Sequence, residues 1–197
     1  MRISSLRTAL LSTVMAVAAV SASPAWAIPI SVGFNFVPNG TLTSSPVNDI
    51  TAATTVTSGA PDTVTTILFN NIGLTTGTTI NLTSPTPVTL GALFTKSFTT
   101  PMGTFSESLT VTLVTPGTNS RGITATGTIS QTAGTGFDPT PVSYSAAYTQ
   151  NAGPGTQINA SFNNSTTPPG VPEPASLALL GTALIGFGLA RRRRRSA

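Results

Sequence analysis

Few side chains of this sequence could carry out acid–base or nucleophilic chemistry. Histidine and cysteine are both absent, which excludes an imidazole base, a thiol nucleophile and a cysteine-ligated metal. Lys96 is the only lysine, so it is the only amine base that a serine nucleophile could use. We therefore expect a protein that is not an enzyme and that needs neither a cofactor nor a metal.

Carboxylates could still act in pairs, as they do in glycoside hydrolases. Between residues 28 and 170 they are Asp49, Asp62, Glu107 and Asp138. None lies in a recognisable motif, and the three aspartates fall in turns or at strand ends, where a solvated carboxylate is the ordinary outcome. Glu107 shares the strand parity of Phe105 and Leu109. It could be a buried catalytic group, but we favour a position at a strand edge or bulge.

The elements around this segment are more informative, above all residues 171–197. They begin with Val171, Pro172, Glu173 and Pro174, continue with an uncharged apolar run over 175–190, and then reach Arg191, Arg192, Arg193, Arg194 and Arg195. A helix over that run spans roughly 24 Å, somewhat less than the ~30 Å hydrocarbon core. Snorkelling arginines can absorb the difference, and positive charge marks the cytoplasmic side. We predict a transmembrane helix over 175–190 rather than a buried soluble helix.

The order of motif, apolar helix and arginine cluster resembles the PEP-CTERM sorting signal of exported bacterial proteins. The resemblance implies recognition of residues 171–174 by an exosortase, a membrane-embedded cysteine transpeptidase, with Arg191–Arg195 as the stop-transfer cluster. The two prolines hold Glu173 extended, as a peptide entering an enzyme cleft should be. A plain membrane anchor with a proline-rich collar is the alternative. The resemblance is confined to the tail, so it implies a destination and leaves the activity open.

Residues 1–27 have the three parts of a secretory signal peptide. Arg2 and Arg7 precede an apolar stretch over 9–20, and the small residues Ala25 and Ala27 frame a cleavage site. Signal peptidase, acting with Sec-type export machinery, would leave Ile28 as the mature N-terminus. A retained N-terminal anchor is the less favoured alternative.

The net charge of the whole chain does not indicate which partners the segment between the two targeting elements binds. The net charge of +4 and the pI near 10.8 are typical of nucleic-acid binders. However, the basic residues are concentrated in the two targeting segments, and between residues 28 and 170 only Lys96 and Arg121 are basic. Four acidic residues in that segment leave it with a net charge of −2, so we exclude nucleic acid as a partner.

The segment 28–162 alternates apolar and polar residues, which predicts half-buried strands rather than disorder. In the first strand Ile30, Val32, Phe34 and Phe36 share a face. About nine strands are expected, around residues 30–36, 50–57, 64–69, 78–83, 88–94, 105–113, 123–130, 142–148 and 158–162. Short strands separated by Gly, Pro and Asn turns favour an all-β domain, an antiparallel β-sandwich or jelly roll. A parallel β-helix would need a fixed repeat, which we do not find. Residues 163–170 are expected to form a linker.

Three functions remain open from the sequence. The tail favours an exported surface or matrix protein, anchored transiently in the inner membrane, structural or adhesive in role, and associated with exopolysaccharide. A carbohydrate-binding module is the first alternative, and it would need exposed aromatic rings such as Tyr144 or Tyr148, although we expect these to be core residues. An ice-binding surface is the second, and it would need a flat threonine array. The residues that motivate it are Thr110, Thr112, Thr124, Thr126 and Thr128.

Overall fold

The structure, a computed structural model, describes residues 27–167. All regular elements in this range are β-strands, and it contains no helix of the length and apolarity that a membrane span requires. The strands are β1 (Ile28–Pro29), β2 (Val32–Val37), β3 (Leu42–Ser45), β4 (Thr55–Ser58), β5 (Asp62–Asn70), β6 (Thr79–Leu82), β7 (Thr86–Pro87), β8 (Leu93–Thr100), β9 (Gly103–Gly117), β10 (Ser120–Ala133), β11 (Phe137–Asp138), β12 (Thr140–Gln150) and β13 (Ile158–Thr166). The predicted signal peptide and transmembrane helix lie outside the described residues, apart from Ala27.

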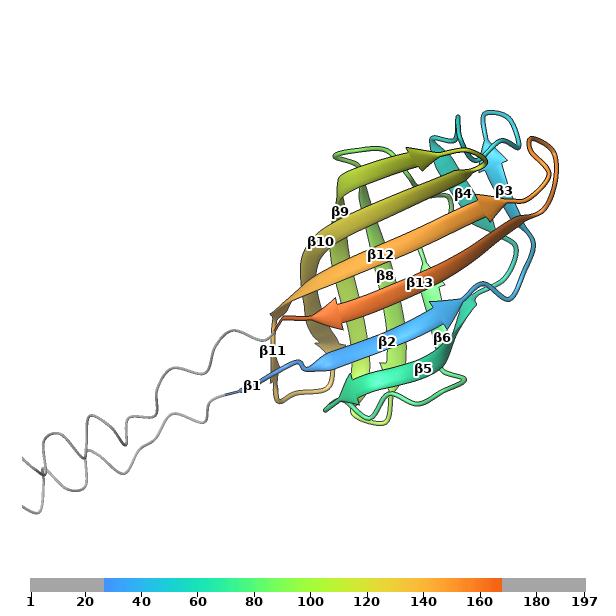
Figure 1. The fold of residues 1–197 in the computed structure, drawn as a ribbon. Helices are drawn as coiled ribbons and strands as arrows, with labels where there is room; N and C mark the ends of the chain where they lie inside the picture. Colours follow the sequence, from blue (N-terminus) through green and yellow to red (C-terminus); the bar gives the residue numbers. More distant parts are fainter. Residues whose placement is uncertain (1–26, 168–197) are drawn as a thin grey trace, which may run out of the picture.

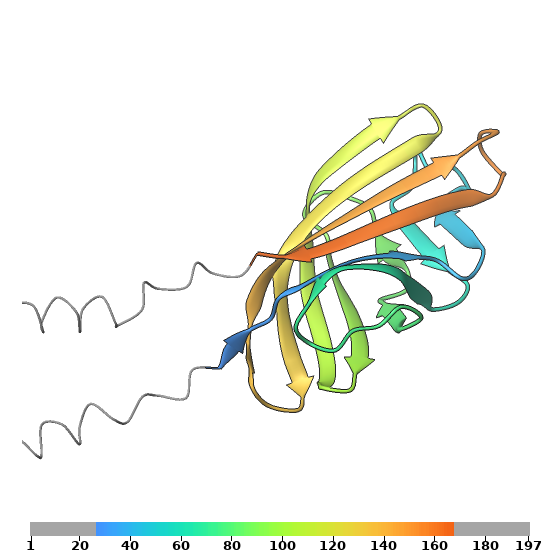
Figure 2. The same cartoon turned by 60° about the horizontal axis from the view of Figure 1, so that its bottom comes forward.

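Eight of these strands form a closed antiparallel barrel (Figures 1 and 2). Its order is β12-β10-β9-β8-β6-β5-β2-β13, and β13 pairs back with β12 to complete the ring. The all-β prediction is confirmed, but the closed ring is not clearly the predicted sandwich or jelly roll. Alternation of apolar and polar residues is the same in both architectures, since each has one buried face.

The remaining strands lie at the two ends of the barrel. β3, β4 and β7 form a small antiparallel extension that joins β13 where Leu42 pairs with Ile158. At the other end, β1 and β11 form a short parallel pair through Ile28 and Phe137. Figure 2 shows β3 and β4 beside the barrel at the end away from β1.

Aromatic rings fill the centre of the barrel. Phe34 and Phe36 on β2 are fully buried, and Tyr144 and Phe162 reach them from β12 and β13. The centroids of Phe36 and Phe162 lie 4.9 Å apart, and those of Phe94 and Tyr144 lie 5.4 Å apart with the rings edge to face. The predicted inward face of the first strand is confirmed, because Ile30, Val32, Phe34 and Phe36 all have no exposed area.

The last strand runs further than the sequence analysis expected. β13 continues through Thr166, so residues 163–166, assigned above to the linker, belong to the barrel. Phe162, Asn164 and Thr166 alternate as inward residues, and Thr166 Oγ1 accepts a hydrogen bond from Val32 N at 2.9 Å. The polar composition of residues 163–166 predicted a spacer, but these residues continue β13, and Asn164 and Thr166 are buried inside the barrel.

Both ends of the described chain lie at the same end of the barrel (Figure 1). Ile28 N donates to the carbonyl oxygen of Gly136 at 3.0 Å, and Thr167 N donates to that of Pro141 at 2.9 Å. The turn between β9 and β10 and the loop over 151–157 lie at the opposite end, because β9, β10 and β12 run the full length of the barrel. Residues 28 and 167 therefore lie at the same end of the barrel.

Candidate functional site

A buried ion pair lies inside the barrel. Lys96 on β8 and Glu107 on β9 are directly opposite each other in the antiparallel register, and both side chains are 0% exposed. Lys96 Nζ lies 3.0 Å from Glu107 Oε2. The favoured prediction of a strand-edge or bulge position for Glu107 is therefore wrong. Its parity with Phe105 and Leu109 places it in the interior, and the amine opposite it compensates the charge.

Asn164 on β13 completes this cluster. Its Nδ2 donates to Glu107 Oε1 at 3.0 Å, so the two oxygens of one carboxyl group contact the amine and the amide. Asn164 is also fully buried, and its Oδ1 accepts no hydrogen bond from any residue of the described range. We refer to Lys96, Glu107 and Asn164 as the interior triad.

Aromatic rings enclose the amine of the triad. Lys96 Nζ lies 4.8 Å from the ring centroid of Phe34, 5.0 Å from that of Phe36 and 5.5 Å from that of Tyr144. Burial lowers the pKa of Lys96 and raises the pKa of Glu107, and the attraction between the two opposes both shifts only in part. Burial thus weakens the preference of both groups for their charged forms, since charges are costly in an apolar interior.

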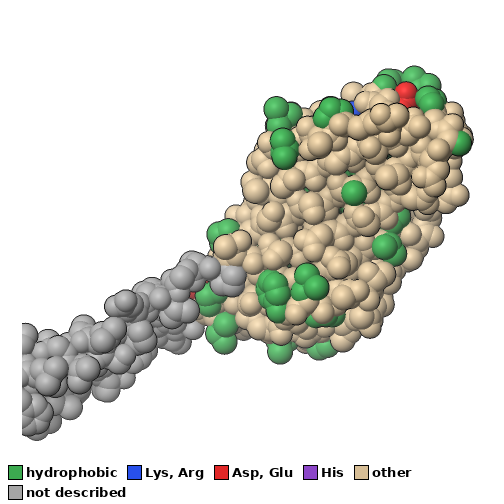
Figure 3. Space-filling view, in the orientation of Figure 1, with side chains coloured by type: hydrophobic (Ala, Val, Ile, Leu, Met, Phe, Trp, Pro, Cys, Tyr) green, Lys and Arg blue, Asp and Glu red, His purple; other side chains and the backbone are tan. Residues whose placement is uncertain are grey.

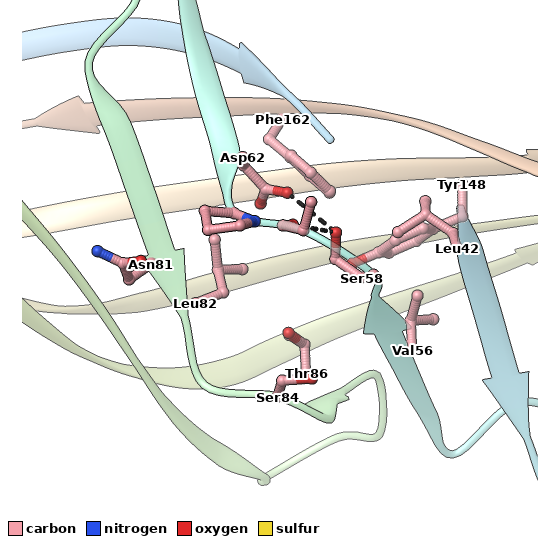
Figure 4. A pocket seen from close by; sticks show the side chains of 13 residues that line it. Leu42, Val56, Ser58, Asp62, Asn81, Leu82, Ser84, Thr86, Tyr148 and Phe162 are labelled. Carbon is pink, nitrogen blue, oxygen red and sulfur yellow. Dashed lines mark hydrogen bonds between the residues drawn. The ribbon is translucent and has the colours of Figure 1, made fainter. Parts of the chain in front are cut away.

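A pocket of about 260 Å³ opens next to the barrel wall, between the β3–β4–β7 extension and β6 (Figure 4). Its lining is mixed, with Leu42, Val56, Leu82, Tyr148 and Phe162 as apolar members and Ser58, Asp62, Asn81, Ser84 and Thr86 as polar members. Asp62 begins β5 and is only 3% exposed, although the sequence predicted a solvated turn residue. The pairing of Asp62 with Ile80 on β6 draws it into the wall.

The carboxyl group of Asp62 is the only acidic group of this pocket. Ser58 Oγ, which donates to the carbonyl oxygen of Ala60 at 2.6 Å, also lies 3.5 Å from Asp62 Oδ1. Burial raises the pKa of Asp62 to about 6, against smaller opposing effects of Ser58 and of the Lys96 charge. One carboxyl group that titrates near neutral pH could bind an amine or a hydroxyl group. Among residues 27–167, however, no group of three or more His, Cys, Asp or Glu side chains is arranged to hold a metal ion.

We expect Asp62→Asn to stabilise the protein at pH 7 and to leave its stability unchanged at pH 3.5. The folded-state pKa lies above the ordinary value of 3.8, so ionisation of Asp62 destabilises the folded state as the pH rises from 3.8 to about 6. Removing that ionisation should raise the free energy of unfolding at pH 7 by about 1 to 2 kcal/mol. This is less than the energy equivalent of the whole pKa shift, because water in the pocket screens the carboxylate. Urea unfolding at both pH values measures this. Asp138→Asn, an exposed control, should change stability by less than about 0.5 kcal/mol, and an equal gain at both pH values would contradict the assignment.

The structure also locates the residues behind the two alternative functions. Tyr144 and Tyr148 are 0% and 2% exposed, so they are core residues, as favoured above, and they form no surface platform. Thr126 pairs with Thr110, but two residues along β10 Thr124 pairs with Leu113 and not with Thr112, because a bulge interrupts the register. The threonines therefore do not form a regular array across β9 and β10.

The sorting residues predicted from the sequence are not described structurally. Val171, Pro172, Glu173, Pro174 and Arg191–Arg195 lie outside residues 27–167, and so does Ala25, whereas Ala27 is the first described residue. The places of Lys96 and Asn164 in the interior triad and of Asp62 in the pocket were not predicted from the sequence. The sequence does contain a signal for Lys96. It shares the strand parity of Phe94 and Phe98, as Glu107 shares that of Phe105 and Leu109, which indicates an inward position for both charged residues.

Comparison with known proteins gives one match. Residues 170–195 match a family model described as the PEP-CTERM protein-sorting motif. The predicted resemblance of the tail is thereby confirmed, and the motif implies an exported protein with a transient membrane anchor and an exosortase as its processing partner. Searches of curated proteins and of solved structures found no match.

Proposed function

We propose that this chain, which carries a PEP-CTERM sorting motif at residues 170–195, is a structural or adhesive protein of the bacterial cell surface or extracellular matrix. The motif is the observation that carries the proposal. An exosortase-like transpeptidase acts on residues 171–174 while the helix over 175–190 lies in the inner membrane with the arginine cluster in the cytoplasm. Signal peptidase removes residues 1–27 during Sec-type export, and the barrel is the exported cargo.

The surface of the barrel supports a role among hydrated polysaccharides. Of the six charged residues between 27 and 167, Asp62, Lys96 and Glu107 are buried. The face in Figure 3 is accordingly almost free of charged side chains, with scattered apolar side chains between uncharged polar ones. Hydroxyl and amide groups can exchange hydrogen bonds with sugar hydroxyls without bringing fixed charge to the contact.

The arrangement of the chain ends supports the same proposal. Residues 27 and 167 lie at one end of the barrel, so the sorting tail and the former signal-peptide junction share the side that faces the membrane during export. The turn between β9 and β10 and the loop over 151–157 then point outward. A non-enzymatic role agrees with the isolation of Asp62 and with the full engagement of Glu107 by its neighbours. Carbohydrate binding through aromatic stacking and ice binding have less support, given the buried tyrosines and the interrupted threonine ladder.

Replacing Glu173 with Ala tests the sorting step. We expect the Glu173→Ala variant to accumulate as an uncleaved, membrane-retained precursor, because the carboxylate between two prolines is the only charge that an enzyme can recognise in the motif. Fractionation of the native host, followed by mass spectrometry of the C-terminus in each fraction, measures the shift from released to retained protein.

Ser176→Ala, two residues after the motif, is the matched control and should be processed like the wild type. Deletion of an exosortase from the host should reproduce the Glu173→Ala result in the wild-type protein. Release of Glu173→Ala at the normal level, with its C-terminus shortened as in the wild type, would refute recognition of the motif.

A further inference from the structure

The interior triad is unusual for a segment that contains so few charges. Two of the six charged residues of 27–167 lie fully inside the barrel, in contact with a buried amide. A buried ion pair contributes little net stability, because desolvation of both groups offsets their attraction. The arrangement therefore calls for an explanation beyond stability, and its chemistry provides one.

We propose that Lys96 and Asn164 form an intramolecular isopeptide bond, with Glu107 as the proton relay. The three residues are the components that such a reaction needs, namely an amine nucleophile, a carboxamide electrophile and a carboxyl group that contacts both. This modification is independent of the sorting function proposed above.

Two sets of contacts bring the reacting groups together. Glu107 contacts Lys96 Nζ with one oxygen and the Asn164 amide with the other, each at 3.0 Å. In addition, the rings that enclose Lys96 Nζ belong to the strand neighbours of Asn164, since Asn164 pairs with Phe34 on β2 and with Tyr144 on β12. The amine of Lys96, on β8, thus lies among rings that belong to the two strands flanking Asn164 in the sheet.

The environment prepares each group for reaction. Burial lowers the pKa of Lys96, which favours the unprotonated, nucleophilic amine. It raises the pKa of Glu107, which favours a carboxylic acid that can donate a proton. The oxygen and nitrogen of an Asn amide exchange positions by a half-turn of the side chain. After this half-turn Asn164 Oδ1 would accept the Glu107 proton, and it has no other partner in the described residues.

The bond changes are balanced. The lone pair of Lys96 Nζ attacks Asn164 Cγ and forms the new C–N bond, while Glu107 protonates the carbonyl oxygen. Glu107 then takes a proton from the attacking nitrogen and delivers one to Nδ2. The Cγ–Nδ2 bond breaks, one molecule of ammonia leaves, and the carbonyl oxygen returns its proton to Glu107. No oxidant, reductant or cofactor is consumed. Fixed positions and exclusion of water replace the activation that an amide otherwise needs.

The product would link two walls of the barrel. β8 and β13 are four places apart in the ring of eight strands, and Figure 1 shows β13 on the front wall and β8 on the back wall. β13 is also the last strand before the sorting tail. The link would therefore hold the strand that takes any load applied through the tail, in a chain that has no cysteine for disulfides.

The full chain, produced in a host without an exosortase so that its C-terminus is known, provides the test. Its intact mass should fall below the sequence mass by one ammonia, about 17 Da. A chymotryptic digest should contain the fragment 95–98 joined through Lys96 to a fragment that begins at Asn163. Since Lys96 is the only lysine, an amine-reactive reagent applied to the urea-unfolded protein should label the N-terminus and leave residue 96 unlabelled.

Two variants complete the experiment. Glu107→Gln, checked for folding by circular dichroism, should retain its full sequence mass and a reactive Lys96. Asn164→Asp should still form the link but with loss of water, about 18 Da. A folded wild-type protein of full sequence mass with a reactive Lys96 would overturn the proposal. So would a loss of ammonia that maps to Asn39, which precedes Gly40 and could cyclise on its own.

Discussion

Lys96→Met should lower the free energy of unfolding by about 3 to 5 kcal/mol, because it leaves the Glu107 carboxyl group inside the barrel without its partner. Methionine matches the length of the lysine stem, so the packing against Phe34 and Phe36 changes little. The loss should be larger at pH 8 than at pH 5. Burial already raises the pKa of Glu107, and removal of the Lys96 charge raises it further, so the folded state becomes less stable as the pH rises above the ordinary value of 4.5.

The double variant Lys96→Met/Glu107→Gln is the control for this assignment. The double variant has no carboxyl group at residue 107. Its free energy of unfolding should therefore lack the decrease between pH 5 and pH 8 that is expected for Lys96→Met. Its free energy of unfolding at pH 8 should exceed that of Lys96→Met. Urea unfolding followed by circular dichroism gives both quantities, and the titration of Asp62 cancels because it is common to the two proteins. A Lys96→Met variant as stable as the wild type at pH 8 would mean that residues 96 and 107 do not interact in the folded protein.

Local pattern predicted most of the core but could not predict closure of the sheet. Parity alone identified the inward residues Val142, Tyr144, Ala146 and Tyr148, and all are buried. Closure depends on β13, which pairs with β2 on one side and with β12 on the other. The pairing with β2 joins residues more than a hundred positions apart, and the alternation of one strand contains no information about its neighbours.

The interior triad shows why a rule about single residues can fail. A lone buried glutamate is costly, and this cost favours a strand-edge position for Glu107 over the interior position that its parity indicates. In the structure the two-residue turn Pro101–Met102 places residue 96 opposite residue 107. Opposite charges at inward positions of one hairpin were thus a readable signal. Asn164 was missed for another reason, because the polar run from Asn163 to Thr166 resembles a linker in composition although it continues the alternation of Phe162.

The strand β9 contains a second departure from simple parity. Uninterrupted alternation along the predicted strand 105–113 would place Phe105, Leu109, Val111 and Leu113 on one face. In the register with β10, Ala125 pairs with Val111 and Thr124 with Leu113, so Thr112 is an additional residue at a bulge. A bulge reverses the parity of the residues that follow it. Leu113 is accordingly 55% exposed, whereas Val114 packs against the core.

Alanine substitutions at Leu109 and Leu113 should therefore have very different effects, although the two leucines lie on one strand. Leu109 has no exposed area, so Leu109→Ala should lower the free energy of unfolding by about 2 to 5 kcal/mol through lost burial and a cavity. Leu113→Ala should cost less than about 1 kcal/mol, because more than half of this side chain is already in water. Urea unfolding of the two variants under identical conditions compares them directly. Similar losses would mean that β9 runs straight through Thr112, with Leu113 on the buried face that uninterrupted alternation assigns to it.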